Sequence, residues 1–327
     1  MTPASLDAAA PAGVTARHPE GEPPMPLRRS LLLILPLLAA ACADRPAQKD
    51  PLALRFGAAL TAADTGADAL ILRMDGFERM AMREDAAIAF AAGGRGAAPR
   101  LAPPGTGAAE AAGQVLAPGF AALGAYARAL TEAAGGEADA GEESVAGGAV
   151  LARAAAEGLT AVRTASGTVV ADPVRTAGLA GIAALADLPA RHDVRLPALV
   201  AEAAPHVAAV TALLRAVIGP EPGQGTRGAI RARREGLDAG HGRFLAAVAA
   251  DRRLGPGERY TIYRSVAEQR EGDPAQGSFT AMIDLLARLD AAQAALAAGA
   301  GDAAERVTAF EAAVARLGAL AEATRRG

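Results

Sequence analysis

The chain has 327 residues, a formal net charge of −3 and a sequence pI near 5.9. Because binding to phosphate backbones needs a net basic face, this charge argues against a nucleic acid partner. Apolar residues make up 51% of the chain, but aromatic residues make up only 3% and there is no Trp, so alanine supplies much of the apolar content. This composition favours helices over sheets and predicts an all-α, alanine-rich bundle of about seven to nine helices with little or no β structure.

Residues 1–24 are rich in proline, alanine and glycine and carry the acidic residues Asp7, Glu20 and Glu22. Acidic residues are unusual in front of an export signal, where the chain is normally basic. We therefore predict that residues 1–24 form a non-native or disordered extension and that translation begins at Met25.

Residues 25–42 have the three parts of a secretory signal peptide. Arg28 and Arg29 form a short basic head, the apolar stretch 31–38 follows, and three alanines lead to Cys42, the only cysteine of the chain. The apolar stretch is too short to span a bilayer, which takes about 20 residues. The segment resembles the signal of a bacterial lipoprotein. This resemblance implies that residues 25–41 are removed by cleavage between Ala41 and Cys42, and that Cys42 carries the lipid that attaches the chain to the membrane.

An alternative reading of the same segment stays open. The lipoprotein pattern usually has leucine three places before the cysteine, whereas this chain has Ala39 there and Leu38 one place further back. Ala39 and Ala41 also fit ordinary secretory cleavage, which would release a soluble periplasmic protein. Ala43 after the cysteine, by resemblance to the sorting rule of enterobacterial lipoproteins, favours an anchor in the outer membrane that faces the periplasm.

Residues 42–51 contain Pro46 and Pro51 and predict a short tether, so that the helical bundle domain covers residues 52–327. Apolar residues at helical spacing predict one or two helices over 56–88, with a possible break at Thr65 and Gly66. The proline-rich stretch 93–107 predicts a surface loop. The next stripes predict helices over 106–134 and around 150–162, the second one capped by Asp139 and Glu142. Residues 166–170 are the only short stretch with strand-like composition.

Further stripes predict a short helix near 179–185, a longer one over 199–217 that Pro205 would kink, and others over 230–248 and 260–266. The last two stripes, over 279–296 and 307–320, predict an antiparallel helical hairpin, with Asp302 as the N-cap of its second helix. A division into two domains near 170–195 or 219–226 remains an alternative.

Gly223–Gly228 spells G-x-G-x-x-G, but an apolar helix rather than a strand precedes it, so we predict a turn and no dinucleotide site. The start of the following helix carries a basic cluster that could contact a partner or lipid headgroups, or else form a solvated face paired with Glu235 and Asp238. This basic cluster consists of Arg227, Arg231, Arg233 and Arg234.

No metal site, cofactor or catalytic residue is predicted from the motifs. His192, His206 and His241 lie far apart in sequence, and His206, beside a core stripe, is interpreted as a core or boundary residue. The acidic residues Glu132, Glu137, Asp139, Glu142 and Glu143 lack the spacing of a known calcium loop. The serines have no partnered histidine in a known motif. Tyr260 and Tyr263, close to Arg259 and Arg264, are interpreted either as packing at a helix start or as a contact surface.

Together these features predict a lipid-anchored periplasmic protein that serves as a non-catalytic structural or binding component of the bacterial cell envelope. Its expected partners are the membrane, through Cys42, and an envelope protein. Two alternatives are a bundle that binds a small apolar ligand or lipid between its helices and an envelope hydrolase.

Overall fold

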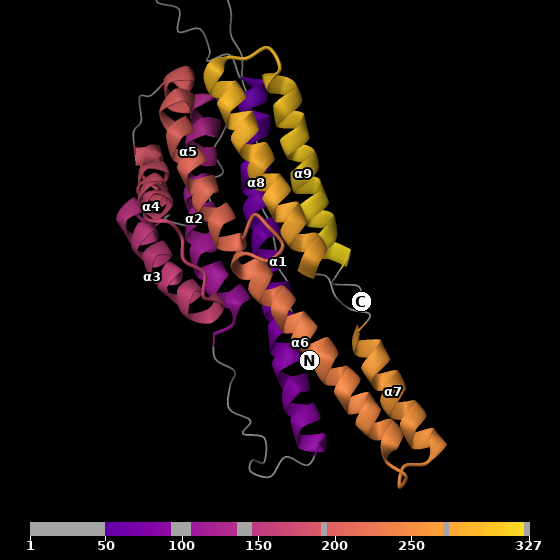
Figure 1. Cartoon of the computed structure of the whole chain (residues 1–327). Helices are drawn as coiled ribbons and strands as arrows, with labels where there is room; N and C mark the ends of the chain where they lie inside the picture. The colour runs from indigo at the N-terminus through magenta and orange to yellow at the C-terminus, as the bar shows by residue number, and fades with distance from the viewer. Residues whose placement is uncertain (1–49, 93–105, 136–145, 191–194, 271–274, 324–327) are drawn as a thin grey trace, which may run out of the picture. The chain divides into compact units, whose positions relative to one another are not determined.

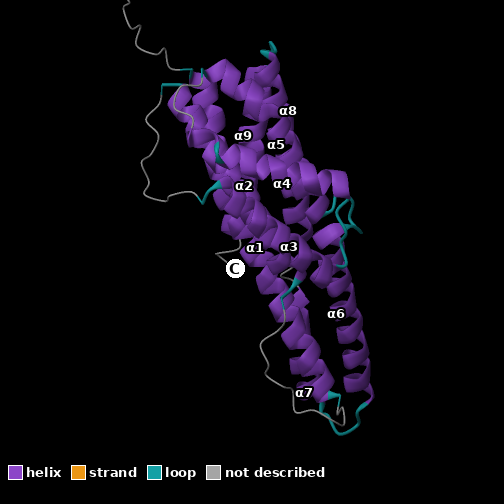
Figure 2. Cartoon of the chain, turned by 90° about the vertical axis from the view of Figure 1, so that its left-hand side faces the viewer, coloured by secondary structure: helices purple, strands orange, loops and turns teal. Residues whose placement is uncertain are grey.

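The computed structural model describes residues 50–92, 106–135, 146–190, 195–270 and 275–323, all of which belong to one compact unit. Within these ranges the chain forms nine α-helices and one short 3₁₀ turn. Figure 2 shows helices joined by loops and no strand in this part of the chain. The prediction of an all-α, multi-helix bundle is therefore confirmed for this part of the chain.

Seven of the nine helices pack into a bundle (Figure 1). Helix α1 lies against α2 and α9, α2 also contacts α3, α4 and α5, and α8 joins α5 to α9. Helix α6 contacts several bundle helices, chiefly α1, and then leads into α7. The bounds are α1 Pro51–Ala91, α2 Ala108–Ala133, α3 Gly148–Ser166, α4 Asp172–Ala186, α5 Leu196–Ile218, α6 Gly225–Ala250, α7 Pro256–Arg270, α8 Ala275–Ala298 and α9 Ala303–Ala323.

Helix α1 is one continuous helix, so the break expected at Thr65 and Gly66 is wrong. Its start is well defined: the Asp50 carboxylate accepts hydrogen bonds from the backbone N–H groups of Leu52 and Ala53, and Pro51 occupies the first turn. Gly66 lies in the middle of the helix because a Cβ there would come within 3.0 Å of the Leu317 side chain of α9. The glycine thus allows close packing of α9 and does not interrupt the helix.

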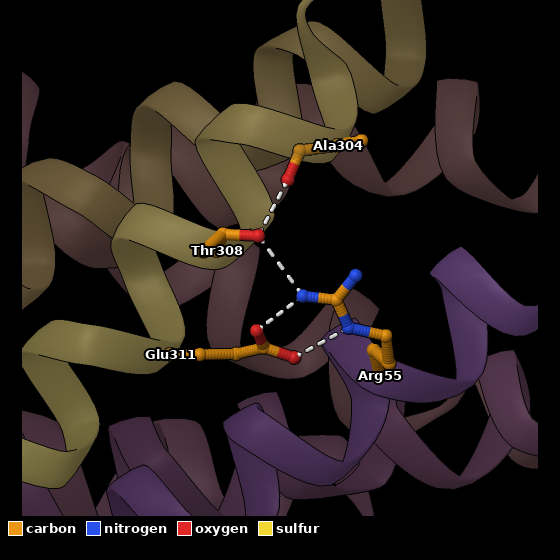
Figure 3. Close-up of polar contacts among 4 residues, drawn as sticks. All are labelled: Arg55, Ala304, Thr308 and Glu311. Atoms are coloured by element: carbon orange, nitrogen blue, oxygen red, sulfur yellow. Dashed lines mark hydrogen bonds and ion pairs between the residues drawn. The ribbon is translucent and has the colours of Figure 1, made fainter.

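A polar clasp also joins α1 to α9 near the N-terminal end of α1 (Figure 3). The Arg55 guanidinium donates two hydrogen bonds to the Glu311 carboxylate and a third to the Thr308 hydroxyl, which in turn donates to the carbonyl of Ala304 at 2.9 Å. The hydrogen bond from Arg55 lowers the pKa of Glu311. Beneath the clasp, the rings of Phe56 and Phe310 pack with their centroids 5.6 Å apart.

The segment between α3 and α4 contains no strand, in line with the expectation of little or no β structure: Ser166 ends α3 and Gly167, at φ +70°, terminates the helix in the left-handed conformation. The expected start of α4 needs correction. Helix α4 begins at Asp172, earlier than the apolar stripe indicates, because Pro173 suits the first turn of a helix. The stripe marks only the buried face of this helix.

Helix α5 is the one described helix that is long and apolar enough to cross a membrane by length and composition. A core helix passes the same test, and α5 packs against α2, α4, α6 and α8. Its residues Val207, Val210 and Leu214 are fully buried in the core cluster. The apolar character of α5 is therefore explained by packing inside the bundle.

Candidate interaction surface on α6 and α7

The stretch Gly223–Gly228 forms the tight turn and first residues of α6, as predicted. Gly225 has φ +60°, and a Cβ on it would come within 2.5 Å of the backbone nitrogen of Gly219. The Thr226 hydroxyl donates a buried hydrogen bond to the Val217 carbonyl of α5 at 3.0 Å. The glycines of this stretch allow α6 to fold back closely on the end of α5.

The basic cluster on α6 is engaged by neighbouring side chains. Arg231 pairs with Glu235 at 2.8 Å and Arg234 pairs with Asp238 at 3.4 Å, both one turn further along the helix. These two pairs are the ones that the sequence predicts for a solvated face.

The other two arginines of the cluster reach neighbouring helices. Arg227 donates to the Thr280 hydroxyl of α8 at 3.1 Å, and Arg233 lies 4.0 Å from the Asp85 carboxylate of α1. The cluster therefore serves largely to tie α6 to itself and to the bundle.

The buried histidine of the described residues is His241 on α6, not His206. His241 is only 1% exposed, and its Nε2 lies 3.0 Å from Oε1 of Glu84 on α1. Its Nδ1 is buried without a hydrogen bond partner among the described residues. His206 on α5 is half-buried.

The position of His241 in the sequence indicates that it is buried. Position 241 lies four residues after Leu237 and seven before Val248, on the buried face of α6. The polar side chain hid its core position. The contact with Glu84 joins α1 to α6, and no group of three or more potential metal ligands occurs among the described residues.

Helix α7 carries two of the exposed aromatic side chains among the described residues, the other being Phe90 near the end of α1. Tyr260 and Tyr263 are 66% and 61% exposed, and their spacing of three residues places them on one side of the helix, with Arg264 next to them. We call Tyr260, Tyr263 and Arg264 the tyrosine face. The third tyrosine, Tyr126, is fully buried in the bundle, so exposure of the other two is not a general property of this residue type here.

The apolar residues of α7 lie away from the tyrosine face, which stays exposed. Val266 is buried and Ile262 half-buried, and α6 is the helix against which α7 packs. Figure 1 shows α7 beside the C-terminal part of α6. The buried side of α7 therefore carries Val266 and Ile262, and the two tyrosines lie on its exposed side.

The start of α7 is fixed by local hydrogen bonds. The Glu258 carboxylate accepts from the backbone N–H of Gly255 at 2.7 Å, and the Arg259 guanidinium donates to the carbonyl of Asp251 at 2.9 Å. Arg264 pairs with Glu268 at 2.6 Å. These contacts all lie within the loop before α7 and α7 itself.

Three buried polar side chains of the bundle, Tyr126, Gln293 and Glu78, have hydrogen-bond partners. The Tyr126 hydroxyl of α2 donates to Oε1 of Gln293 of α8, and Nε2 of Gln293 donates to the Val200 carbonyl of α5, both at 3.0 Å. Burial raises the pKa of the Tyr126 hydroxyl. Glu78, also buried, accepts from the backbone N–H of Ala109 at 2.7 Å and thereby satisfies the start of α2.

Asp64 and Asp68 form an acidic pair on α1. Burial raises the pKa of the Asp64 carboxyl to about 6, the charge of Asp68 one turn later adds to the shift, and Arg128 of α2 opposes it. Burial also raises the pKa of Asp68. The pair therefore costs free energy when both carboxyls are charged.

Several predicted site residues lie outside the described residues. These are Ala41, Cys42, His192 and the acidic residues Glu137, Asp139, Glu142 and Glu143, together with the cap expected for α3 and most of the predicted loop over 93–107. Comparisons with protein-family models, curated proteins and solved structures find no match to this chain.

Proposed function

We propose that this chain is a lipid-anchored periplasmic protein of the bacterial cell envelope, and that its helical domain is a non-catalytic component that binds a partner through α7. The observation that carries the binding role is the tyrosine face. Its two large aromatic side chains are exposed on one side of α7, and the described helix with which α7 makes its main contact is α6. Exposed aromatic residues grouped in this way are typical of contact surfaces.

The proposed location is supported by the sequence around Cys42. The basic head, the apolar stretch and the small residues before Cys42 have the order that export with lipid attachment requires. The folded domain begins soon afterwards, where Asp50 caps α1, so that only a short tether separates it from Cys42. Several acyl chains on one cysteine would hold the protein firmly, since each buried methylene contributes about 0.8 kcal/mol.

The location is tested by Cys42→Ser in a bacterium that makes the full chain. We expect palmitate labelling to disappear and the chain to be found as unprocessed precursor or soluble protein. Unchanged labelling or unchanged membrane attachment of the variant would contradict the proposal. Ser30→Ala, in the same signal region, is the control and should leave labelling unchanged.

The binding role is tested by photocrosslinking in intact cells, with p-benzoyl-phenylalanine placed at position 260. The matched control places it at position 72, because Leu72 on α1 is also a large exposed side chain, at 71%. We expect a discrete crosslinked product from position 260 and none of the same size from position 72. Identical patterns from both positions, or no product from position 260, would contradict a binding role for α7.

A further inference from the structure

We infer that the partner that binds to the tyrosine face is an acidic polypeptide segment. This inference rests on the proposed function and adds the chemistry of the partner. The docking surface consists of the tyrosine face and the two arginines of the loop that precedes α7, Arg252 and Arg253. All five side chains are exposed. They lie at the end of the pair of helices α6 and α7, which we call the hairpin.

The charge of the hairpin is opposite to that of the chain. Between Gly225 and Glu268 there are nine arginines and five acidic residues, whereas the whole chain has a net charge of −3. Residues 225–268 therefore have a net charge of +4, and the rest of the chain has a net charge of −7. Such a separation attracts an acidic partner to the hairpin and keeps it away from the bundle.

Several arginines of the hairpin are already paired, but those of the loop are not. Arg231, Arg234 and Arg264 each pair with a carboxylate one turn away. Arg252 and Arg253 are exposed and form no ion pair with another described residue. Their positive charge is available to carboxylates of a second molecule, directly before the helix that carries the tyrosines.

The pairing of tyrosine with arginine favours a polypeptide partner. Tyrosine and arginine are the side chains, with tryptophan, that most often dominate the binding energy of protein interfaces. Both have an apolar body and a polar end, so they can remain exposed in the free protein and still bury apolar area on binding. A purely electrostatic contact would not need Tyr260 and Tyr263.

A membrane surface fits this face less well. Helices that lie in a membrane interface bury a broad apolar face, whereas the large apolar residues of α7, Ile262 and Val266, are directed to α6.

The experiment uses the full chain from Cys42, with Cys42→Ser so that it is soluble, and a fluorescein-labelled peptide of repeated Glu-Leu-Glu-Ala units. Binding is followed by fluorescence anisotropy at several salt concentrations. We expect saturable binding that weakens as salt increases. Tyr260→Ala combined with Tyr263→Ala should weaken it about tenfold or more, while Arg252→Gln combined with Arg253→Gln should weaken it and flatten its salt dependence.

Leu72→Ala and Arg175→Gln are the matched controls, since both residues are exposed on the bundle, and neither should change the affinity. Circular dichroism confirms that each variant is folded. The inference is overturned if the peptide does not bind, if the tyrosine variant binds as well as the parent chain, or if the controls lose as much affinity as the hairpin variants.

Two further outcomes would assign the surface to another occupant and overturn the inference. One is tyrosine-dependent binding to vesicles of phosphatidylglycerol without binding to the peptide. The other is tyrosine-dependent self-association in analytical ultracentrifugation. If position 260 still yields a discrete crosslink in cells while the peptide fails to bind, only the acidic chemistry is wrong; if both experiments fail, the proposed binding role is wrong as well.

Discussion

The bundle and the α6–α7 hairpin are built from the same alanine-rich sequence but use their large side chains differently. In the bundle, phenylalanines and leucines from α1, α2, α5, α8 and α9 meet in one buried cluster. In the hairpin, α7 has one well-buried large residue, Val266, and its two tyrosines are exposed. The two tyrosines exposed on one side of α7 therefore make the hairpin the candidate region for binding.

The largest expected effect is on the free energy of unfolding when a buried side chain is truncated to alanine. Phe310→Ala removes a fully buried ring that packs on Phe56, and it should lower the free energy of unfolding by about 3–5 kcal/mol. Val266→Ala in α7 should leave the main thermal transition almost unchanged, since loss of this contact opens the hairpin locally. Calorimetry of both variants checks this. A comparable loss of stability from Val266→Ala would show that the hairpin and the bundle unfold together.

A buried hydrogen-bond network that joins α2, α8 and α5 is the second property of the bundle. Gln293→Leu removes the partner of both the Tyr126 hydroxyl and the Val200 carbonyl, so we expect a loss of about 2 kcal/mol. Gln114→Leu, the same change at an exposed position of α2, is the control and should have little effect. Urea denaturation measures both. Equal stability of the Gln293 variant and the parent would mean that the network contributes nothing.

The acidic pair of α1 makes the bundle sensitive to pH. The folded pKa of Asp64, about 6, lies above its ordinary value near 4, so the folded chain holds more protons than the unfolded chain between these values. The free energy of unfolding should therefore fall as the pH rises from about 4 to 6.

Asp64→Asn should reduce this pH dependence, leaving the part that comes from Asp68, and stabilise the protein at pH 7.5 by about 1 kcal/mol, a value that allows for solvent screening at a half-buried site. Asp172→Asn, at an exposed residue of α4, is the control. Melting temperatures of the three proteins across this pH range provide the measurement. The interpretation fails if the Asp64 variant keeps the slope of the parent.

The smallest expected effect on stability is that of the tyrosine face. Tyr260→Ala combined with Tyr263→Ala should change the free energy of unfolding by less than about 0.5 kcal/mol, because both side chains are exposed. Urea denaturation beside the parent chain measures it. A large destabilisation would mean that the tyrosines pack in the folded protein and are not a binding surface.

The sequence predicted the helices well where apolar residues repeat along one face, as in α2, α5, α8 and α9. It failed where a small residue serves a neighbour: Gly66 suggested a break in α1, but it makes room for Leu317. His206 is half-buried, which agrees with a boundary residue, whereas the buried histidine is His241, which the spacing from Leu237 and Val248 could have indicated. The role of Gly66 depends on a contact between distant residues, which local spacing does not contain.

The same limit applies to the candidate site. The sequence grouped Tyr260, Tyr263 and their flanking arginines but left packing and contact as alternatives. Exposure of the two tyrosines argues against packing, and it depends on which face of α7 meets α6. The arginine cluster showed the reverse: the pairs with Glu235 and Asp238 follow from helical spacing and were predicted correctly.

Hydrogen exchange of the full chain from Cys42, with and without the Glu-Leu-Glu-Ala peptide, tests most directly whether stability lies in the bundle and recognition in the hairpin. In the free protein, amides of α7 should exchange much faster than those of α2 and α5. With the peptide, exchange should slow in α7 and the preceding loop and stay unchanged in α2 and α5. Protection of α7 equal to that of the bundle in the free protein, or slowing outside the hairpin on addition of the peptide, would contradict the account.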